Sequence, residues 1–254
     1  MKFARFSRNG QTSFGVVQDG RVKALRSDLF EQPDYSGEEY ALDDLQLLAP
    51  VQPGKLVCVG LNYRLHAKES GLPVPDEPML FMCSPDAIIA TGDTIVLDSD
   101  TDRIDFEAEI AIVVSKTCKN VPSEQAANFI FGYTCANDVS NRDLQRKDGQ
   151  FTRAKSFDTY KPMGPWIETE LDPDNVAIEL RQNGETRQSS NTSDMIFSIG
   201  RIFEFVSSIM TLNAGDVIIT GTPSGVGPMK GGDVIEISIE GIGSLSNKVA
   251  SRQQ

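Results

Sequence analysis

The stretch Asp105-Phe106-Glu107-Ala108-Glu109-Ile110-Ala111-Ile112-Val113-Val114 decides the fold of this chain. Its apolar, β-branched second half predicts a strand. Because side chains alternate between the faces of a strand, Glu107 and Glu109 point the same way. Both faces are apolar beyond these acids, which predicts a buried central strand. Two ionised carboxylates side by side there need a cation or a shared proton; otherwise this strand end reaches solvent and both acids are exposed.

The bulk composition is that of an ordinary globular protein with a strong excess of acid. The 254 residues allow one large domain, or one domain with a small addition. Hydrophobic residues make up 39% and charged residues 24%, and the formal net charge is −12. That charge argues against a nucleic-acid backbone or an anionic membrane as partner. A small anionic substrate stays compatible, because local cationic groups can still gather it.

The cysteines and the apolar runs indicate a soluble protein of a reducing compartment. Cys58, Cys83, Cys118 and Cys135 show no CxxC spacing, which predicts reduced, buried thiols rather than disulfides or a zinc site. The first residues lack the apolar centre of a signal peptide, and no apolar run is long enough to span a membrane. We therefore expect a cytoplasmic protein.

Turn signals divide the chain into a small N-terminal β unit, residues 1–50, and a larger part, residues 51–254. The Asp19-Gly20 turn predicts a hairpin in the first unit, whose apolar content is too thin for a core of its own. In the larger part, strands are expected after the Gly-Asp pairs that begin at 92, 215 and 232. Helices are expected over 61–71, over 123–130 and after the Ser198 cap. The pattern favours a mixed β fold with few helices.

A third acid joins the pair on the central strand as a candidate metal ligand. Asp138 closes the strand-like run that begins at Phe131. A site made of Glu107, Glu109 and Asp138 would offer only oxygen ligands, which select Mg²⁺, Mn²⁺ or Ca²⁺ over zinc. Sequence spacing alone does not bring Asp138 to the other two.

His66 is the only histidine of the chain and a candidate general base. Glu69 follows three residues later, and positions three apart share one face of a helix. A carboxylate beside an imidazole fixes its tautomer and raises its basicity. The alternative is a structural or solvated histidine on a short charged helix.

Cationic residues and a glycine-rich loop complete the set of candidates. Arg142, Arg146, Lys147, Arg153 and Lys155 follow Asp138, either as a solvated loop or as groups that gather an anionic substrate. The loop from Thr220 to Gly227 lacks the ending of a phosphate loop. It is either a plain turn or a place where glycines allow a ligand close to the backbone, with the Thr222 hydroxyl beside it.

Taken in this order, the motifs resemble those of the fumarylacetoacetate hydrolase family over residues 53–250. The resemblance implies a mixed β-sandwich roll with a small N-terminal β unit, usually in a homodimer. It implies Mg²⁺ or Mn²⁺, with Ca²⁺ as a non-native occupant, held by Glu107, Glu109 and Asp138. The motifs are Gly60-Leu61-Asn62-Tyr63 with His66 and Glu69, Asp105 to Glu109, Gly132 to Gln145, Lys155-Ser156-Phe157-Asp158, and Thr220 to Gly227.

The same resemblance implies roles for the remaining candidates. The segment of His66 and Glu69 would be a lid, and Lys155 would be catalytic. The substrate would be contacted by Arg142, Gln145 and Thr222. One position departs from the family: many members carry lysine where Cys83 stands, so a carboxylate held by that lysine would be held differently here.

The resulting hypothesis is a hydrolase that cleaves a carbon–carbon bond in a 2,4-diketo acid, such as an acylpyruvate or fumarylpyruvate from aromatic catabolism. His66, oriented by Glu69, would deprotonate a water that attacks the distal carbonyl, and pyruvate would leave as an enolate held at the metal. Lys155 and Gln145 would stabilise the developing oxyanion. The same enolate would serve an oxaloacetate-type decarboxylase or a 2-hydroxy-dienedioate isomerase. A further alternative is a non-catalytic, metal-stabilised protein that binds a 2-oxo acid.

Overall fold

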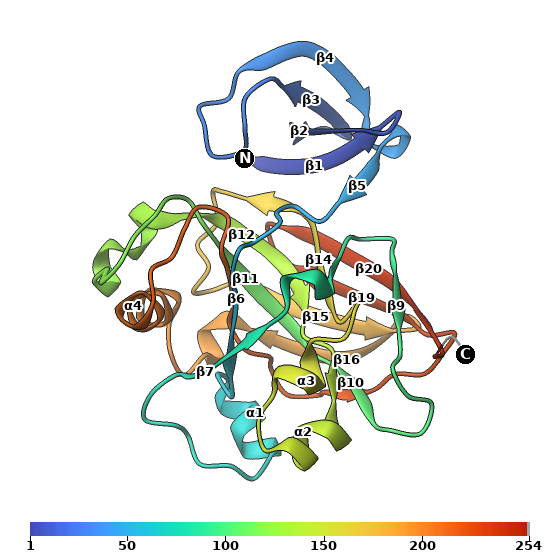
Figure 1. Ribbon diagram of the computed structural model, residues 1–254, viewed down its shortest axis with the longest axis vertical. Helices are drawn as coiled ribbons and strands as arrows, with labels where there is room; N and C mark the ends of the chain where they lie inside the picture. Colours follow the sequence, from blue (N-terminus) through green and yellow to red (C-terminus); the bar gives the residue numbers. More distant parts are fainter. Residues whose placement is uncertain (253–254) are drawn as a thin grey trace.

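The computed structural model describes residues 1–252 of the chain, and in this part strands dominate (Figure 1). The largest sheet has the order β4-β3-β2-β1-β14-β12-β11-β17-β6-β7, with β5 beside β1 and β8 beside β14. This architecture confirms the predicted mixed β fold with few helices. The strands of the sheet are β1 (Lys2–Arg8), β2 (Gln11–Gln18), β3 (Arg21–Leu25), β4 (Tyr35–Ala41), β5 (Gln46–Leu48), β6 (Leu56–Gly60), β7 (Met79–Cys83), β8 (Ile88–Ile89), β11 (Ala108–Val114), β12 (Ile130–Asn137), β14 (Lys161–Glu168) and β17 (Val217–Ile219).

Two smaller sheets complete the architecture of the described residues. A five-stranded sheet has the order β16-β15-β19-β20-β9, and a three-stranded one has the order β13-β10-β18. All three predicted Gly-Asp starts lead into strands, namely β9, β17 and β19. The strands of the smaller sheets are β9 (Thr94–Val96), β15 (Ala177–Gln182), β16 (Glu185–Asn191), β19 (Val234–Ile239), β20 (Gly243–Ala250), β10 (Ile104–Phe106), β13 (Ser140–Asn141) and β18 (Gly227–Pro228).

The central acidic strand is divided at Glu107, where the chain passes from the three-stranded sheet to the large one. The prediction of one continuous strand over 105–114 was therefore wrong at this point. Asn137 and Gln188 side chains accept the hydrogen bonds of the Glu107 and Ala108 backbone N–H groups, at 2.9 Å each. These side chains satisfy the backbone where the strand changes partners. Beyond the break, β11 is buried along its whole length, as expected.

The helices are short. The expected helix over 61–71 is only α1 (Arg64–Glu69), because Leu61 has a φ of 51° and Asn62 bonds the backbone of Phe197 and Thr220 instead. The helix expected from Ser123 is a 3₁₀ helix, Ser123–Phe129, whose N-cap is Pro122. No helix among residues 1–252 is both long and apolar enough to cross a membrane. The other helices are α2 (Arg142–Asp148), α3 (Thr152–Lys155), α4 (Ile199–Ile209), and 3₁₀ turns at Leu42–Asp44, Pro85–Ala87 and Thr192–Asp194.

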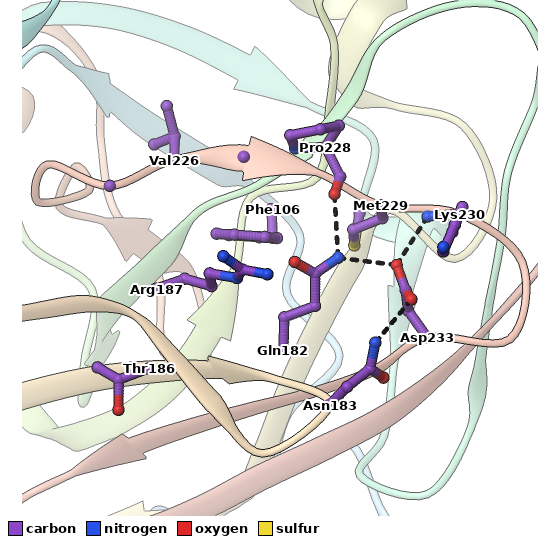
Figure 2. A pocket seen from close by; sticks show the side chains of 12 residues that line it. Phe106, Gln182, Asn183, Thr186, Arg187, Val226, Pro228, Met229, Lys230 and Asp233 are labelled. Carbon is purple, nitrogen blue, oxygen red and sulfur yellow. Dashed lines mark hydrogen bonds between the residues drawn. The ribbon is translucent and has the colours of Figure 1, made fainter.

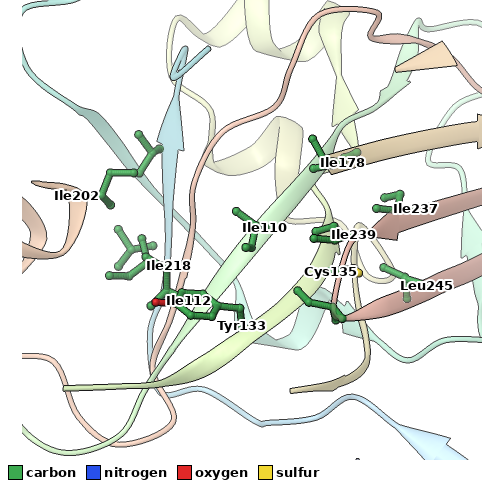
Figure 3. Packing of buried hydrophobic residues seen from close by; sticks show 14 of the residues in the cluster. Ile110, Ile112, Tyr133, Cys135, Ile178, Ile202, Ile218, Ile237, Ile239 and Leu245 are labelled. Atoms are coloured by element: carbon green, nitrogen blue, oxygen red, sulfur yellow. The ribbon is translucent and has the colours of Figure 1, made fainter. Parts of the chain in front are cut away.

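The main core lies between the large and the five-stranded sheets, as in a sandwich (Figure 3). One face of β11 supplies Ile110 and Ile112 to this core; Ile110 points toward Ile239 of β19, and Ile112 lies near Ile218 and Tyr133. Helix α4 closes this core with the buried side chains of Ile199, Ile202, Phe203 and Val206, and Ser198 accepts a hydrogen bond from the Arg201 N–H at its start, as the predicted cap requires. All four cysteines are buried with free thiols.

The N-terminal β unit joins the large sheet through β1, which pairs with β14 (Figure 1). Phe3, Val16 and Leu25 share a buried cluster with Ala111 and Val113, on the second face of β11. The unit therefore packs on the rest of the chain, as its thin apolar content predicts. The domain boundary at about residue 50 stays a prediction.

Candidate metal centre and active site

The three candidate ligands converge, with one oxygen from each of Glu107, Glu109 and Asp138 within 4.8 Å of the others. Glu109 lies on β11, Glu107 precedes that strand, and Asp138 follows β12. The register of the two strands aligns Ala108 with Asn137, and the Asp138 N–H donates to the Glu107 carbonyl at 2.9 Å. The carboxylate residues are 4%, 2% and 1% exposed, so the solvent-exposed alternative is wrong.

Three cations lie against these acids. The Lys155 ammonium, at the end of α3, donates to Glu107 Oε2 at 2.7 Å and to Asp138 Oδ2 at 2.6 Å. The Arg142 guanidinium, at the start of α2, donates to Asp105 Oδ2 at 2.9 Å and to Glu107 Oε1 at 2.5 Å. Lys161, on β14, lies with Nζ 2.7 Å from Asp138 Oδ1. Buried ion pairs of this kind fix the geometry of both partners.

Charge is unevenly compensated within this cluster. Burial alone would raise the pKa of Glu107, but Arg142 and Lys155 hold it well below its usual range. For Glu109, burial and the repulsion of Asp138 and Glu107 act together and raise the pKa well above its usual range. Within residues 1–252, Glu109 forms no salt bridge and accepts one hydrogen bond, from the Gly221 N–H. It is the acid that a bound cation would relieve most.

The donor set therefore fits a divalent cation. Four buried carboxylates, with Asp105 the fourth, face three largely buried cations, Arg142, Lys155 and Lys161. Arg103 pairs with Asp105 from the surface at 2.8 Å, so among residues 1–252 Glu109 is the acid of this group that has no salt bridge, and the candidate ligands are oxygen alone. Mg²⁺ and Mn²⁺ prefer this kind of site.

His66 faces the same cavity from α1, and Glu69 lies beside it on that helix. His66 Nδ1 lies 3.2 Å from Glu69 Oε2, and the His66 side chain is 12% exposed. Both oxygens of Glu69 accept a hydrogen bond at 3.1 Å from the N–H of Gly225, in the glycine-rich loop. The cavity has a volume of about 490 Å³ and is lined by His66 together with the three acids. The predicted base His66, the predicted lid segment that carries it and the glycine-rich loop therefore lie together at this cavity.

The residues expected to contact substrate, Arg142, Gln145 and Thr222, also line this cavity, but all three already form hydrogen bonds with other side chains. Arg142 uses its donors on Asp105, Glu107 and Gln145, the last at 2.8 Å. The Thr222 hydroxyl accepts a hydrogen bond from Gln188 at 2.8 Å, which leaves its own hydrogen to donate. Arg142 therefore positions the acids as well as lining the cavity.

Sequence reasoning missed Lys161, Gln188 and the role of Asp105. Gln188 joins the Ala108 N–H to Thr222 and the Pro223 carbonyl, which ties the acidic strand to the glycine-rich loop. A lysine directly before Pro162 on an apolar strand was the available signal for Lys161. Nothing local marks Gln188, which lies 80 residues from its partner Ala108.

A second cavity, of about 720 Å³, shares Val226 with the first (Figure 2). Its wall is held by Asp233, which accepts hydrogen bonds from Gln182 and Asn183 at 2.8 and 2.9 Å. Arg187 lies beside the Phe106 ring in this view. The candidate metal ligands do not line this second cavity.

Comparison with known proteins gives two family matches that divide the chain. The family model described as fumarylacetoacetate (FAA) hydrolase, C-terminal, matches residues 55–250. A second model, described as Rv2993c-like, N-terminal, matches residues 1–50.

Three similar proteins are enzymes of different reactions on small organic acids. Oxaloacetate tautomerase YisK of Bacillus subtilis is 43% identical over 225 residues, 83% of this chain and 75% of that protein. A crystal structure of 2-hydroxyhepta-2,4-diene-1,7-dioate isomerase from Mycobacterium marinum is 39% identical, with full coverage of both chains and a TM-score of 0.93. Maleylpyruvate hydrolase from Sphingobium sp. SYK-6, in complex with manganese(II) and pyruvate, is 28% identical, with full coverage of both chains and a TM-score of 0.84.

Proposed function

The chain belongs to the fumarylacetoacetate hydrolase family, and we propose that it is a metal-dependent hydrolase that cleaves a carbon–carbon bond in a 2,4-diketo acid. The substrate class is an acylpyruvate, which reacts with water to give a carboxylate and pyruvate. The observation that carries the proposal is one shared cavity: His66, which is bonded to Glu69, and the acid cluster both line it. Hydrolysis needs a base for water beside a group that activates the diketone, and this cavity offers both.

We propose Mg²⁺ or Mn²⁺ as the cofactor, held by Glu107, Glu109 and Asp138. The uncompensated Glu109 carboxylate and the oxygen-only ligand set support a hard divalent cation. The manganese in the maleylpyruvate hydrolase supports the same class of ion. When bound, the cation would supply Lewis-acid polarisation of the 2-oxo group.

His66 is the proposed general base. With Nδ1–H donated to Glu69, the free lone pair is on Nε2, where it can accept a proton from water. The hydroxide adds to the distal carbonyl, and the bond between that carbon and the methylene carbon breaks. Pyruvate departs as its enolate, and the proton held by His66 can return to the methylene carbon.

The remaining residues bind and orient the substrate. The Lys155 ammonium and the Gln145 amide are the proposed donors to the oxyanion that forms at the distal carbonyl. The Thr222 hydroxyl, held by Gln188, can donate to a substrate oxygen. Arg142 keeps Glu107 in place and presents a positive charge to an anionic substrate.

A substrate panel tests the proposal. Metal-loaded protein is given acetylpyruvate, fumarylpyruvate, enol-oxaloacetate and a 2-hydroxy-dienedioate, with Mg²⁺ or with Mn²⁺, and the products are separated. We expect pyruvate and the matching carboxylic acid from the first two, in equal amounts. Carbon dioxide from oxaloacetate alone would indicate a decarboxylase, and binding of these acids without any turnover would indicate a binding protein.

Oxaloacetate tautomerisation is the second candidate, because the 43% identical tautomerase covers most of this chain. That reaction moves a proton between carbon and oxygen and needs no attacking water. His66 could carry the proton in the same cavity. Ketonisation of enol-oxaloacetate faster than any bond cleavage in the panel would favour this candidate, and migration of a double bond in the dienedioate would favour an isomerase.

A further inference from the structure

Lys161 is a fully buried cation that the proposed reaction does not use. It is 0% exposed at the start of β14, and Nζ lies 2.7 Å from Asp138 Oδ1. The ammonium also donates to three backbone carbonyls, those of Lys155, of Tyr160 at 3.0 Å and of Val139 at 3.4 Å. A charge buried this deeply is retained only when its partners satisfy it.

Lys161 contacts two residues of the proposed metal site, the Asp138 carboxylate and the Lys155 backbone. Asp138 is held by two ammonium groups, with Lys155 on Oδ2 and Lys161 on Oδ1. Asp138 Oδ1 has no hydrogen bond of good geometry in the described residues, so the attraction of Lys161 is its main constraint. The bond from Lys161 to the Lys155 carbonyl fixes the end of α3, where the Lys155 side chain begins.

We propose that Lys161 is a positioning residue for the metal site: it holds the Asp138 carboxylate and the Lys155 backbone in the orientation that metal and substrate need. This inference rests on the proposed function, because it assumes that Asp138 is a metal ligand. Two effects oppose each other. Loss of the ammonium removes a charge that repels the metal, but it also frees Asp138 to turn and removes one donor from the carbonyls of Val139, Lys155 and Tyr160, of which Tyr160 keeps the Val139 N–H. Partners behind a metal ligand commonly change metal affinity by about 10- to 100-fold, and we take orientation to dominate.

The test is Mn²⁺ affinity of Lys161→Met, measured by electron paramagnetic resonance of free Mn²⁺, without substrate. Methionine keeps the length and apolar stem of lysine and removes only the ammonium. We expect an affinity at least about tenfold weaker than wild type. We also expect a lower kcat with less change in KM. Equal or tighter Mn²⁺ binding by the folded variant overturns the inference. Absence of Mn²⁺ binding by the wild type overturns the proposed function instead.

A rescue variant separates positioning from a merely structural role. The Cys83 thiol, on β7, lies near enough for the charges of both Lys161 and Asp138 to act on it. A lysine at position 83 would approach Asp138 from β7, into the space left by Lys161→Ala. We expect Cys83→Lys with Lys161→Ala to recover most of the Mn²⁺ affinity that Lys161→Ala loses. Recovery of thermal stability without recovery of Mn²⁺ affinity contradicts the proposal.

A measurement on the wild type covers the case in which these variants do not fold. In protein labelled with ¹⁵N at the lysine side chains, Lys155 and Lys161 should give two ammonium signals that exchange slowly with water. Lys55, one quarter exposed beside Asp216, is the internal reference. Titration with Mg²⁺ should shift both slow signals and leave the Lys55 signal in place. A shift of only one slow signal overturns the role of Lys161.

Discussion

Glu109 is the residue whose energetics depend most on a bound cation. Its pKa is raised by burial and by the neighbouring Asp138 and Glu107 carboxylates, and no cation among the described residues pairs with it. Without metal it therefore costs stability, while with metal it becomes a ligand. Replacing Glu109 should therefore affect the stability of the metal-free protein and that of the metal-bound protein in opposite ways.

We predict that Glu109→Gln abolishes the stabilisation of the protein by metal without destabilising the metal-free form. Wild type at a metal concentration 100 times Kd should gain about 2.7 kcal/mol of unfolding free energy. The variant should gain little, and its metal-free urea midpoint should equal or exceed that of wild type. Glu124→Gln, at an exposed surface position, is the control and should behave like wild type. A metal-free variant that is strongly destabilised would contradict this account of Glu109.

At this scale, the pattern of the acidic strand predicts the site better than the pattern of the cations. Alternation alone orients Glu107 and Glu109 together, and the strand end after residue 137 makes Asp138 a candidate. The burial of Lys161 depends on contacts with Val139 and Asp138, more than 20 residues away in sequence. The apolar strand around Lys161 hints that it is buried, but the local sequence does not encode which carboxylate it contacts.

Helix α1 is held in place by contacts with other segments of the chain. Six residues are too few for a stable isolated helix. The helix is fixed at its start by the Leu65 N–H, which donates to Asp194 Oδ2 at 3.2 Å, and at its end by Glu69, which accepts from Gly225. Both attachments are exposed, and we therefore expect α1 to open when substrate enters.

We predict that Glu69→Gln lowers kcat by about 100-fold, because the His66 tautomer loses its carboxylate partner. The amide can still accept from Gly225, so α1 should stay attached and the Mn²⁺ affinity should equal that of wild type. Steady-state kinetics and Mn²⁺ titration measure the two quantities. Glu77→Gln, also exposed in the segment after α1, is the matched control. An unchanged kcat would exclude a catalytic pair of His66 and Glu69.

The sequence predicts a helix or strand well where apolar residues recur with a clear period. It predicts poorly where a side chain from a distant segment forms hydrogen bonds with the backbone. The Ser198 cap predicts the start of α4 correctly, and the buried residues of that helix recur with helical spacing. The early part of the expected 61–71 helix fails because the Asn62 side chain bonds to distant segments. The strand break at Glu107 has the same kind of cause, since Asn137 and Gln188 replace ladder partners.

On the scale of the whole molecule, the N-terminal β unit and the rest share one buried cluster on the second face of β11. Phe3 is 4% exposed, and its ring lies 5.3 Å from that of Phe131. The pairing of β1 with β14 extends the large sheet into this unit. The sequence predicts that the unit packs on its neighbour, but the choice of β14 rests on long-range contacts. The homodimer expected from the family resemblance stays a prediction.

We predict that Phe3→Ala destabilises the whole chain by about 3–5 kcal/mol rather than releasing the N-terminal unit alone. Trp166, the single tryptophan, lies on β14, and its fluorescence should report the transition where the unit joins. Urea unfolding followed by fluorescence and by circular dichroism should shift together. Tyr35→Ala, at an exposed aromatic of the same unit, should change stability by about 0.5 kcal/mol or less. Two separated transitions would show that the unit folds independently.

The central claim is that the acid cluster and His66 together hydrolyse a carbon–carbon bond. The most direct measurement is the amount of acetate and pyruvate formed from acetylpyruvate by metal-loaded, chelator-treated and reloaded protein, with His66→Ala in parallel. We predict equal amounts of both products from the loaded protein, loss on chelation, recovery on reloading, and at least about 100-fold slower formation by the variant. Cleavage that survives full removal of metal, or that proceeds unchanged in His66→Ala, would contradict the account.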